Sequence, residues 1–423
     1  MNKIDFNNNI KSNSLLINNK IQKICILYIA LWSIAPPLQI GTMYRLLSLL
    51  CVAVWFCFEL KKGIEISKIQ IYYLLLLVAV VIVTVFRRGF SEILSPIALY
   101  MLLLFSIINA YYKNRWHELK NMHIILLIIF TVLNIITYKE ILVNPQITRS
   151  LVRDTEELYV YYKKGVGGYA LIYSQICIFA VGVQWTISCF KKSKIQFAIG
   201  VAWIISLTLF VFKAGYSIAI FTYVASLIIL IFYNRKNSML AIAISISILF
   251  IFLYSIVKFT WLQTFLLNTF EGTTVTKKIH DLIDSARDGT VEGSIYVRVN
   301  AYLSSLKTFF ENPFIGCLWQ PKAGGHSAII DMFANYGVLG GIIYTKMLVF
   351  EQFKRFKEVE NKRINHAINA CIVAIMLVAT LDTISYQFIV PIFIMVPLFL
   401  YNISNEKRDE DNESTLDCKF NTL

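Results

Sequence analysis

The sequence Ser294-Ile-Tyr-Val-Arg298-Val-Asn-Ala-Tyr302 opens a segment of mixed polarity in a chain that is otherwise mostly apolar. The segment continues with Asn312-Pro-Phe-Ile-Gly316 and Gly324-Gly-His-Ser327, and it closes after Asp331 with Tyr336-Gly-Val-Leu-Gly-Gly341. It gathers an arginine, a histidine and an aspartate where a long polar loop returns to apolar sequence. We therefore predict that this segment carries the active site.

The composition places most of the chain in a lipid bilayer. Of the 423 residues, 57% are hydrophobic and only 16% are charged, and a soluble domain of that composition would aggregate. A membrane-spanning helix needs about 20 predominantly apolar residues. Such runs lie at approximately 21–38, 41–60, 69–86, 92–112, 121–138, 167–190, 195–212, 215–233, 238–258, 326–350, 365–384 and 387–403. The sequence predicts one all-α polytopic domain over residues 1–423, with about twelve transmembrane helices.

The distribution of positive charge predicts the orientation in the membrane, because polytopic proteins concentrate Lys and Arg in short cytoplasmic loops. If the N-terminus is cytoplasmic, the even-numbered runs end at the basic groups Lys61-Lys62, Lys113 and Arg115, Lys191-Lys192, Arg235-Lys236 and Lys354-Arg355. Both termini are then cytoplasmic, and so is the polar tail of residues 404–423. The net charge of +14 follows this topology, so we do not expect nucleic acid as a partner.

Two connections are too long to be turns, residues 139–168 and 259–325, and both fall on the external side in this topology. Loops of this length in a compact protein usually carry function. In the second loop, Ser294 is a suitable N-cap for a helix with apolar residues at helical spacing, and Asn312-Pro313 would end it. We expect a helical arm that lies against the membrane-embedded body and brings His326 to the start of the next apolar run.

His326 is the first candidate for catalysis, because an imidazole titrates near neutral pH and can take a proton from an attacking hydroxyl. A single histidine at a helix start often makes only local hydrogen bonds. Here two glycines precede it, and Ser327 and Asp331 follow. Asp331 lies five residues further along and is not directly beneath the imidazole, so we expect it either to orient a neighbour or to face an aqueous cavity.

Arg298 is the second candidate, because a guanidinium presents a fork of donors that matches phosphate oxygens and keeps its charge. Tyr302 follows one helical turn later and is a candidate for substrate binding. The alternative for Arg298 is a solvated helix face. Other cations on the external side either snorkel to lipid headgroups or contribute to a site for a lipid-linked phosphate. These candidates are Arg45, Arg88, Arg153 and Lys213.

The sequence gives no indication of a metal or a cofactor. It contains no zinc-ligand spacing and no glycine-rich phosphate loop of the nucleotide-binding type. Asp281 and Asp284 lack the convergent ligands that a cation needs, and we interpret them as solvated loop charge. Most of the eight cysteines lie inside apolar runs, which argues against an intramolecular disulfide framework.

The pattern of Arg298, Asn312-Pro-Phe-Ile-Gly316, Gly325-His-Ser327, Asp331 and Tyr336-Gly-Val-Leu-Gly340 resembles the signature of the O-antigen ligase and polymerase superfamily. The His-Ser pair resembles the polymerase branch more than the ligase branch. The resemblance implies a GT-C-type inverting glycosyltransferase that works at the periplasmic face of the bacterial inner membrane, without a metal. It would polymerise undecaprenyl-pyrophosphate-linked repeat units of O-antigen or a related surface polysaccharide.

On this resemblance, His326 would activate the acceptor hydroxyl and Arg298 would hold the donor pyrophosphate, with Lys213, Arg88 and Arg153 as helpers. A chain-length regulator is a further candidate partner. Two alternatives remain open. One is an O-antigen ligase, which would pass the glycan to the lipid A core of lipopolysaccharide. The other is a flippase or transporter of lipid-linked oligosaccharide, which would place charges near the bilayer midplane, where this chain has few.

Overall fold

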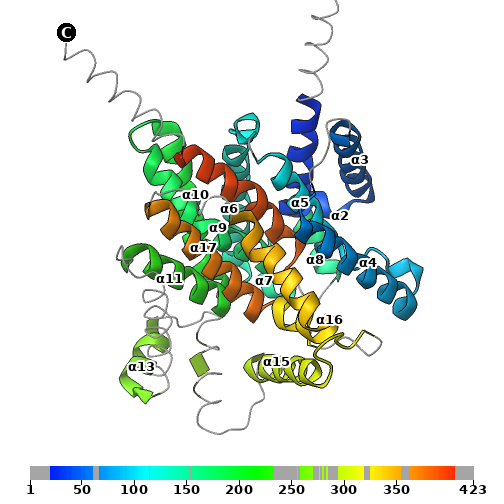
Figure 1. Cartoon of the computed structure of the whole chain (residues 1–423). Helices are drawn as coiled ribbons and strands as arrows, with labels where there is room; N and C mark the ends of the chain where they lie inside the picture. Colours follow the sequence, from blue (N-terminus) through cyan, green and yellow to red (C-terminus); the bar gives the residue numbers. More distant parts are fainter. Residues whose placement is uncertain are drawn as a thin grey trace, which may run out of the picture.

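The architecture comes from a computed structural model that describes residues 20–60, 66–113, 115–145, 147–151, 155–232, 258–269, 294–318, 324–353 and 362–404, with a few single positions between 255 and 283. Every regular element in these ranges is helical, which confirms the predicted all-α class. After a helix of residues 20–34, the elements drawn in Figure 1 are α2 (Pro36–Ile40), α3 (Thr42–Leu60), α4 (Lys68–Arg88), α5 (Ile97–Tyr111), α6 (Met122–Val143), α7 (Ile147–Ser150), α8 (Thr155–Lys164), α9 (Tyr169–Cys189), α10 (Lys194–Ala214), α11 (Ser217–Phe232), α13 (Thr260–Thr269), α15 (Ser294–Glu311), α16 (Ala328–Thr345) and α17 (Lys362–Leu381).

The fold is that of a polytopic membrane protein. Eight stretches in the described part of the chain are long and apolar enough to cross a bilayer: Thr42–Glu59, Lys68–Arg88, Trp116–Val143, Tyr169–Cys189, Lys194–Ala214, Ala328–Phe350, Ile364–Leu381 and Tyr386–Ser404. The shorter apolar helices Ile97–Tyr111 and Ser217–Ile231 lie among them. The predicted run at 238–258 falls almost wholly outside the described residues. Each other predicted run overlaps a described helix.

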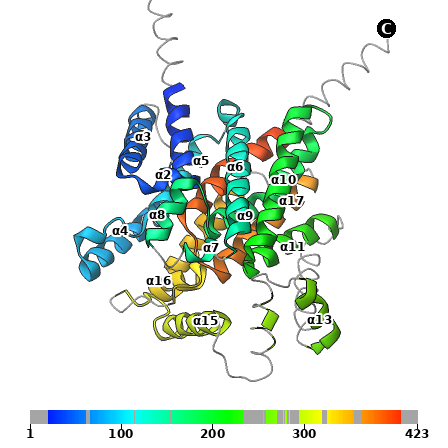
Figure 2. The same ribbon diagram turned by 180° about the vertical axis from the view of Figure 1, so that it is seen from behind.

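The helix bundle has a buried centre and a lipid-facing rim. Within the most apolar 18 residues of the Tyr169–Cys189 and Tyr386–Ser404 spans, 83% are buried inside the protein, whereas only 22% are buried in the corresponding stretch of the Lys68–Arg88 span. Figures 1 and 2 accordingly show α9 in the middle of the bundle and α4 at its edge. Because lipid solvates apolar side chains, the exposed leucines and valines of α4 carry no penalty in a bilayer.

A polar network inside the apolar core fixes the packing of α6, α9 and α10. The side-chain amides of Asn134 and Gln175 exchange two hydrogen bonds, of 2.9 and 2.8 Å. Asn134 also donates to Ser206 Oγ at 3.2 Å, and the Trp203 indole N–H donates to Gln175 Oε1 at 2.9 Å. An unpaired amide in hydrocarbon costs several kcal/mol, so only the helix register that pairs these groups is stable.

The helical arm α15 lies across one end of the bundle, which we call the α15 end (Figures 1 and 2). Its range, Ser294–Glu311, confirms the helix predicted between the Ser294 cap and Asn312-Pro313. The helix of residues 20–34 begins, and the Tyr386–Ser404 span ends, at the opposite end of the bundle (Figure 1).

The segment after α15 docks into a kink of α16. Tyr336 and Gly337 leave helical geometry there, and Gly337 has a φ of 68°, which favours glycine. A Cβ atom at Gly337 would lie 2.0 Å from the carbonyl oxygen of Phe314. The Val338 backbone N–H donates instead to the Pro313 carbonyl at 2.7 Å. The glycine therefore lets the arm connect directly to α16.

The first long connection, residues 139–168, was predicted to be a loop, but much of it is helical. α6 extends to Val143, and α7 and α8 follow within the connection. Lys164 at the end of α8 lies 3.9 Å from Glu140 on α6, so the connection folds back on the bundle. Its apolar Ile141 is 2% exposed, and burial of such residues is the physical reason that the helix continues past the predicted boundary.

Candidate functional site

Arg298 on α15 forms an ion pair with Asp382, the residue that follows α17. Nη1 and Nη2 of Arg298 donate to Asp382 Oδ2 at 3.3 and 3.4 Å. The Tyr173 hydroxyl donates to the same oxygen at 3.2 Å, and the Thr383 backbone N–H donates to Oδ1 at 2.8 Å. Segments from α9, α15 and the end of α17 therefore meet at one buried carboxylate.

Arg298 and Tyr302 also cap the C-terminus of α17. Arg298 Nη1 donates to the Leu381 carbonyl at 3.0 Å, and the Tyr302 hydroxyl donates to the same oxygen at 2.6 Å. The last carbonyls of a helix have no partner within it and carry partial negative charge. This is the physical reason that two residues one turn apart on α15 face the bundle.

The bonds to Asp382 and Leu381 leave two N–H donors of the Arg298 guanidinium unused. A guanidinium has about five N–H donors, and the bonds to Asp382 and Leu381 use both donors of Nη1 and one of Nη2. Nε–H and the other Nη2 donor lie on the remaining edge of the guanidinium. The Tyr302 hydroxyl also interacts with the guanidinium, and 33% of the Arg298 side chain is exposed. Two parallel donors of this kind match phosphate oxygens.

The charge of Arg298 is secured by its surroundings. Burial on its own would lower the pKa of Arg298, but the carboxylate of Asp382 beside it raises the pKa above its ordinary value. The side chain therefore remains a cation at every physiological pH. It can hold Asp382 and still attract an anion at its remaining edge.

The loop before α16 is built around Asp331. Asp331 Oδ2 accepts from the backbone N–H groups of Gly325 and Ser327, at 2.8 and 3.3 Å, and Oδ1 accepts from Ser305 Oγ at 2.7 Å. Gly324 has a φ of 65°, and a Cβ atom there would lie 2.0 Å from Asp331 Oδ1. Asp331 is 7% exposed, and through these bonds it organises the loop.

His326 sits between the two loop positions that Asp331 fixes. Ser327 caps α16, because its Oγ accepts from the Ile330 backbone N–H at 3.1 Å. The imidazole of His326 is partly exposed, and none of the described residues forms a hydrogen bond with it. The backbone on both sides of His326 is thus held while its side chain remains available to a ligand.

Asp382 joins the two halves of the site. Its backbone carbonyl accepts a hydrogen bond from the Ala328 backbone N–H at 3.0 Å, two residues after His326. Its side chain holds Arg298. The structure thus brings Arg298, Tyr302, Asp331 and the His326 loop into one neighbourhood at the α15 end.

Tyrosine side chains line the neighbouring wall. The ring centroids of Tyr169 and Tyr173 are 6.0 Å apart, and those of Tyr173 and Tyr216 are 6.2 Å apart. Tyr216 follows the turn that contains Lys213, an exposed residue in the last turn of α10. Lys213 thus lies three residues before Tyr216 in the sequence, and among the described residues no bond joins it to Arg298.

Two further predicted cations, Arg45 and Arg88, make contacts that do not involve Arg298. Arg45 Nε donates to the Gln39 carbonyl at 3.2 Å, and the Gln39 amide oxygen accepts from Gln387, five residues beyond Asp382. Arg88 lies in the last turn of α4, next to α16. Arg153 lies outside the described residues. Of the predicted cations that the structure describes, Arg298 is the one that hydrogen bonds place in a unit with the His326 loop.

Asp382 and Tyr173 are functional candidates that sequence reasoning missed. Asp382 was counted within the apolar run 365–384. It is the only acidic residue between positions 362 and 404, and a lone acid at the edge of membrane helices is a signal of function or pairing. Tyr173 carries no comparable signal, because tyrosine is common in the chain, which has 23 of them.

The comparisons with known proteins add no family to these observations. No protein-family model matches the chain, and no curated protein is similar to it at a significant level. Among the residues that the structure describes, no group of three or more His, Cys, Asp and Glu side chains is placed to hold a metal ion. The functional argument therefore rests on the site at the α15 end.

Proposed function

We propose that the protein is a glycosyltransferase that polymerises lipid-linked oligosaccharide repeat units into O-antigen or a related surface polysaccharide. The observation that carries the proposal is that Arg298, a partly exposed guanidinium, lies near His326, whose imidazole has no hydrogen-bond partner among the described residues. The two belong to one hydrogen-bonded unit through Asp382. A cation for a leaving phosphate and a base for an attacking hydroxyl are the two groups that this transfer requires.

In the proposed reaction, the acceptor is a hydroxyl of the non-reducing sugar of a new undecaprenyl-pyrophosphate-linked unit. Its oxygen attacks the anomeric carbon of the donor glycan and inverts it. The bond between that carbon and the pyrophosphate oxygen breaks, and the electron pair leaves with the undecaprenyl pyrophosphate. The hydroxyl proton passes to His326. Arg298 stabilises the charge that develops on the leaving phosphate, through its Nε and Nη2 edge.

The orientation belongs to the same proposal. α9 carries Tyr173 at the α15 end, and Lys191-Lys192 lie just beyond its other end, roughly 30 Å away for a helix of this length. By the positive-inside rule, that basic end is cytoplasmic. The α15 end is then periplasmic in the bacterial inner membrane, with both termini cytoplasmic and twelve helices spanning the bilayer.

The deciding test uses a deletion strain complemented with the wild-type gene or with His326→Ala, followed by a glycan gel. We expect the deletion and His326→Ala to leave the lipid A core capped with single repeat units and without long chains. Long-chain ladders in the His326→Ala strain would overturn the catalytic role. Uncapped core with polymer on the lipid carrier would identify a ligase, and cytoplasmic accumulation of repeat units would identify a flippase.

A further inference from the structure

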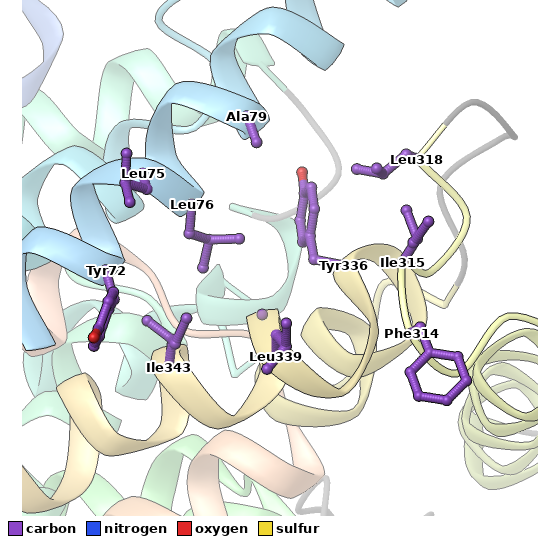
Figure 3. A pocket seen from close by; sticks show the side chains of 11 residues that line it. Tyr72, Leu75, Leu76, Ala79, Phe314, Ile315, Leu318, Tyr336, Leu339 and Ile343 are labelled. Atoms are coloured by element: carbon purple, nitrogen blue, oxygen red, sulfur yellow. The ribbon is translucent and has the colours of Figure 1, made fainter.

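A continuous apolar groove separates α4 from α16, and we call it the α4–α16 groove. Its part near the α15 end has a volume of about 300 Å³ and is lined by residues that include Leu76, Ala79 and Tyr336 (Figure 3). A second part, of about 740 Å³, continues toward the other end of α4, past Lys68 and Lys346. Tyr72 and Ile343 line both parts, so the two form one channel along the rim of the bundle.

The length of the groove exceeds one leaflet of a bilayer. On α4 its lining runs from Ser67 to Ala79, and on α16 and its continuation it runs from Tyr336 to Glu351. At about 1.5 Å per residue, these stretches measure roughly 18 and 22 Å. One leaflet of the hydrocarbon core is roughly 15 Å thick. A chain that fills the whole groove is therefore longer than one leaflet is thick, which favours a long hydrocarbon chain over an acyl chain of a phospholipid.

Charge at the α15 end of the groove favours an anionic head. Arg87 and Arg88 form the last turn of α4, and both are close enough to the Tyr336 hydroxyl to interact with it electrostatically. Figure 3 shows the Tyr336 ring beside α4, with its hydroxyl at the level of Ala79. Within the described residues, no carboxylate pairs with either arginine. Arg87 follows Ala79, the last residue of α4 that lines the groove, by eight positions, about 12 Å along the helix. Two cations this far beyond the end of an apolar groove match an amphiphile with a phosphate head.

A glycine keeps the groove open. Gly340 lines the groove on α16, and a Cβ atom there would lie 2.5 Å from Tyr336 Cβ and 3.3 Å from Leu76 Cδ1. Any side chain at this position would push Tyr336 or Leu76 into the channel. Its neighbour Leu339, which is 68% exposed, also lines the groove.

We propose that the α4–α16 groove holds the single long hydrocarbon chain of a polyprenyl phosphate, with the phosphate at Arg87 and Arg88. The inference rests on the proposed function and extends it. A polymerase brings together two lipid-linked substrates, and this groove, apart from Arg298, receives the carrier of one of them. An isoprenoid chain is long enough to follow the whole groove.

The test measures lipid binding to the full-length protein in nanodiscs of phosphatidylcholine, with a photoactivatable undecaprenyl phosphate as the probe. Ala79→Phe narrows the groove, and Val78→Phe adds the same ring one residue away, where Val78 is 48% exposed to lipid and does not line the groove. We expect Ala79→Phe to reduce labelling about tenfold or more, and Val78→Phe to leave it unchanged. Replacing both Arg87 and Arg88 by Ala should also reduce it, and the labelled peptides should come from α4 and α16.

Several outcomes would overturn the inference: equal labelling of the Ala79→Phe and Val78→Phe variants, crosslinks elsewhere, or displacement of the probe by equimolar phosphatidylglycerol, which would show an ordinary phospholipid groove. The assay needs no turnover, so it separates this inference from the proposed function. If His326→Ala binds the probe normally and the deletion strain still makes long chains, the groove stands and the polymerase proposal fails. If the deletion strain loses long chains but labelling avoids the groove, the polymerase proposal stands and the groove inference fails.

Discussion

Ser305 on the helical arm donates a hydrogen bond of 2.7 Å to Asp331 on α16, and this bond ties the arm to the loop that carries His326. Asp331 thereby links a segment outside the bundle to a membrane helix. The arrangement explains why a carboxylate is needed at position 331, because only an acceptor with two oxygens can serve Ser305 on one side and the Gly325 and Ser327 backbone N–H groups on the other.

Asp331→Ala should release the His326 loop. Hydrogen bonds to a charged group contribute about 1.5–3 kcal/mol each, so we expect a lower melting temperature in detergent and a loss of long-chain polymer. Ser305→Ala removes only one of the three donors and should cost about 1.5–3 kcal/mol, less than Asp331→Ala, with polymer shortened but present. Thermal unfolding and glycan gels measure both effects. Identical behaviour of Asp331→Ala and wild type would contradict the role of Asp331 in the loop.

Asp382→Asn should impair the reaction by misplacing Arg298 while keeping the size of the side chain. We place Asp382 as a positioning residue, because its side chain contacts Arg298, Tyr173 and its own backbone neighbour Thr383. We expect kcat to fall about tenfold or more with a smaller change in KM for the acceptor. The control is Tyr173→Phe, which removes one bond to the carboxylate and should have a weaker effect. An unchanged kcat for Asp382→Asn would refute the positioning role.

Arg298→Lys should recover only part of the activity that Arg298→Ala loses. A lysine ammonium is a single point charge, and it cannot hold Asp382 and present two parallel donors to a phosphate at once. We expect Arg298→Ala to reduce turnover about a hundredfold or more, and Arg298→Lys to remain at least tenfold below wild type. Initial rates with a synthetic lipid-pyrophosphate donor measure this. Full activity of the lysine variant would show that charge alone is sufficient.

Asn134→Leu and Gln175→Leu should be coupled in their effect on stability. Each single change removes the two reciprocal bonds, but Gln175 keeps its bonds with Leu171 and Trp203 and Asn134 keeps its bond to Ser206. Each should therefore cost only about 1 kcal/mol, a typical value for such bonds within membranes. The double variant removes both polar groups, so it should lose less than the sum of the singles. Thermal unfolding in one detergent gives all three values. Strict additivity would show that the reciprocal amide bonds of Asn134 and Gln175 do not act as a pair.

The helical arm α15 shows which parts of the fold can be predicted from residues that are close together in the sequence. Ser294 as a cap and Asn312-Pro313 as a terminator predicted α15, because both act through backbone geometry within a few residues. The apolar runs predicted the membrane helices for a similar reason, since the bilayer imposes length and composition on each helix separately. The end of α6 was missed by several residues, because it depends on which side chains the packed bundle buries.

The sequence by itself determined the helical class, the membrane character and the residues worth testing, Arg298 and His326. Only the tertiary structure decided that Arg298 is paired with Asp382, 84 positions further along the chain, and that Asp331 builds the His326 loop. The tertiary structure also separated Arg88 from Arg298, because Arg88 lies at the end of α4, near Tyr336 of the α4–α16 groove. The physical reason is that helix formation is set by neighbours in sequence, whereas a charge is partnered by whichever distant helix end the packing places beside it.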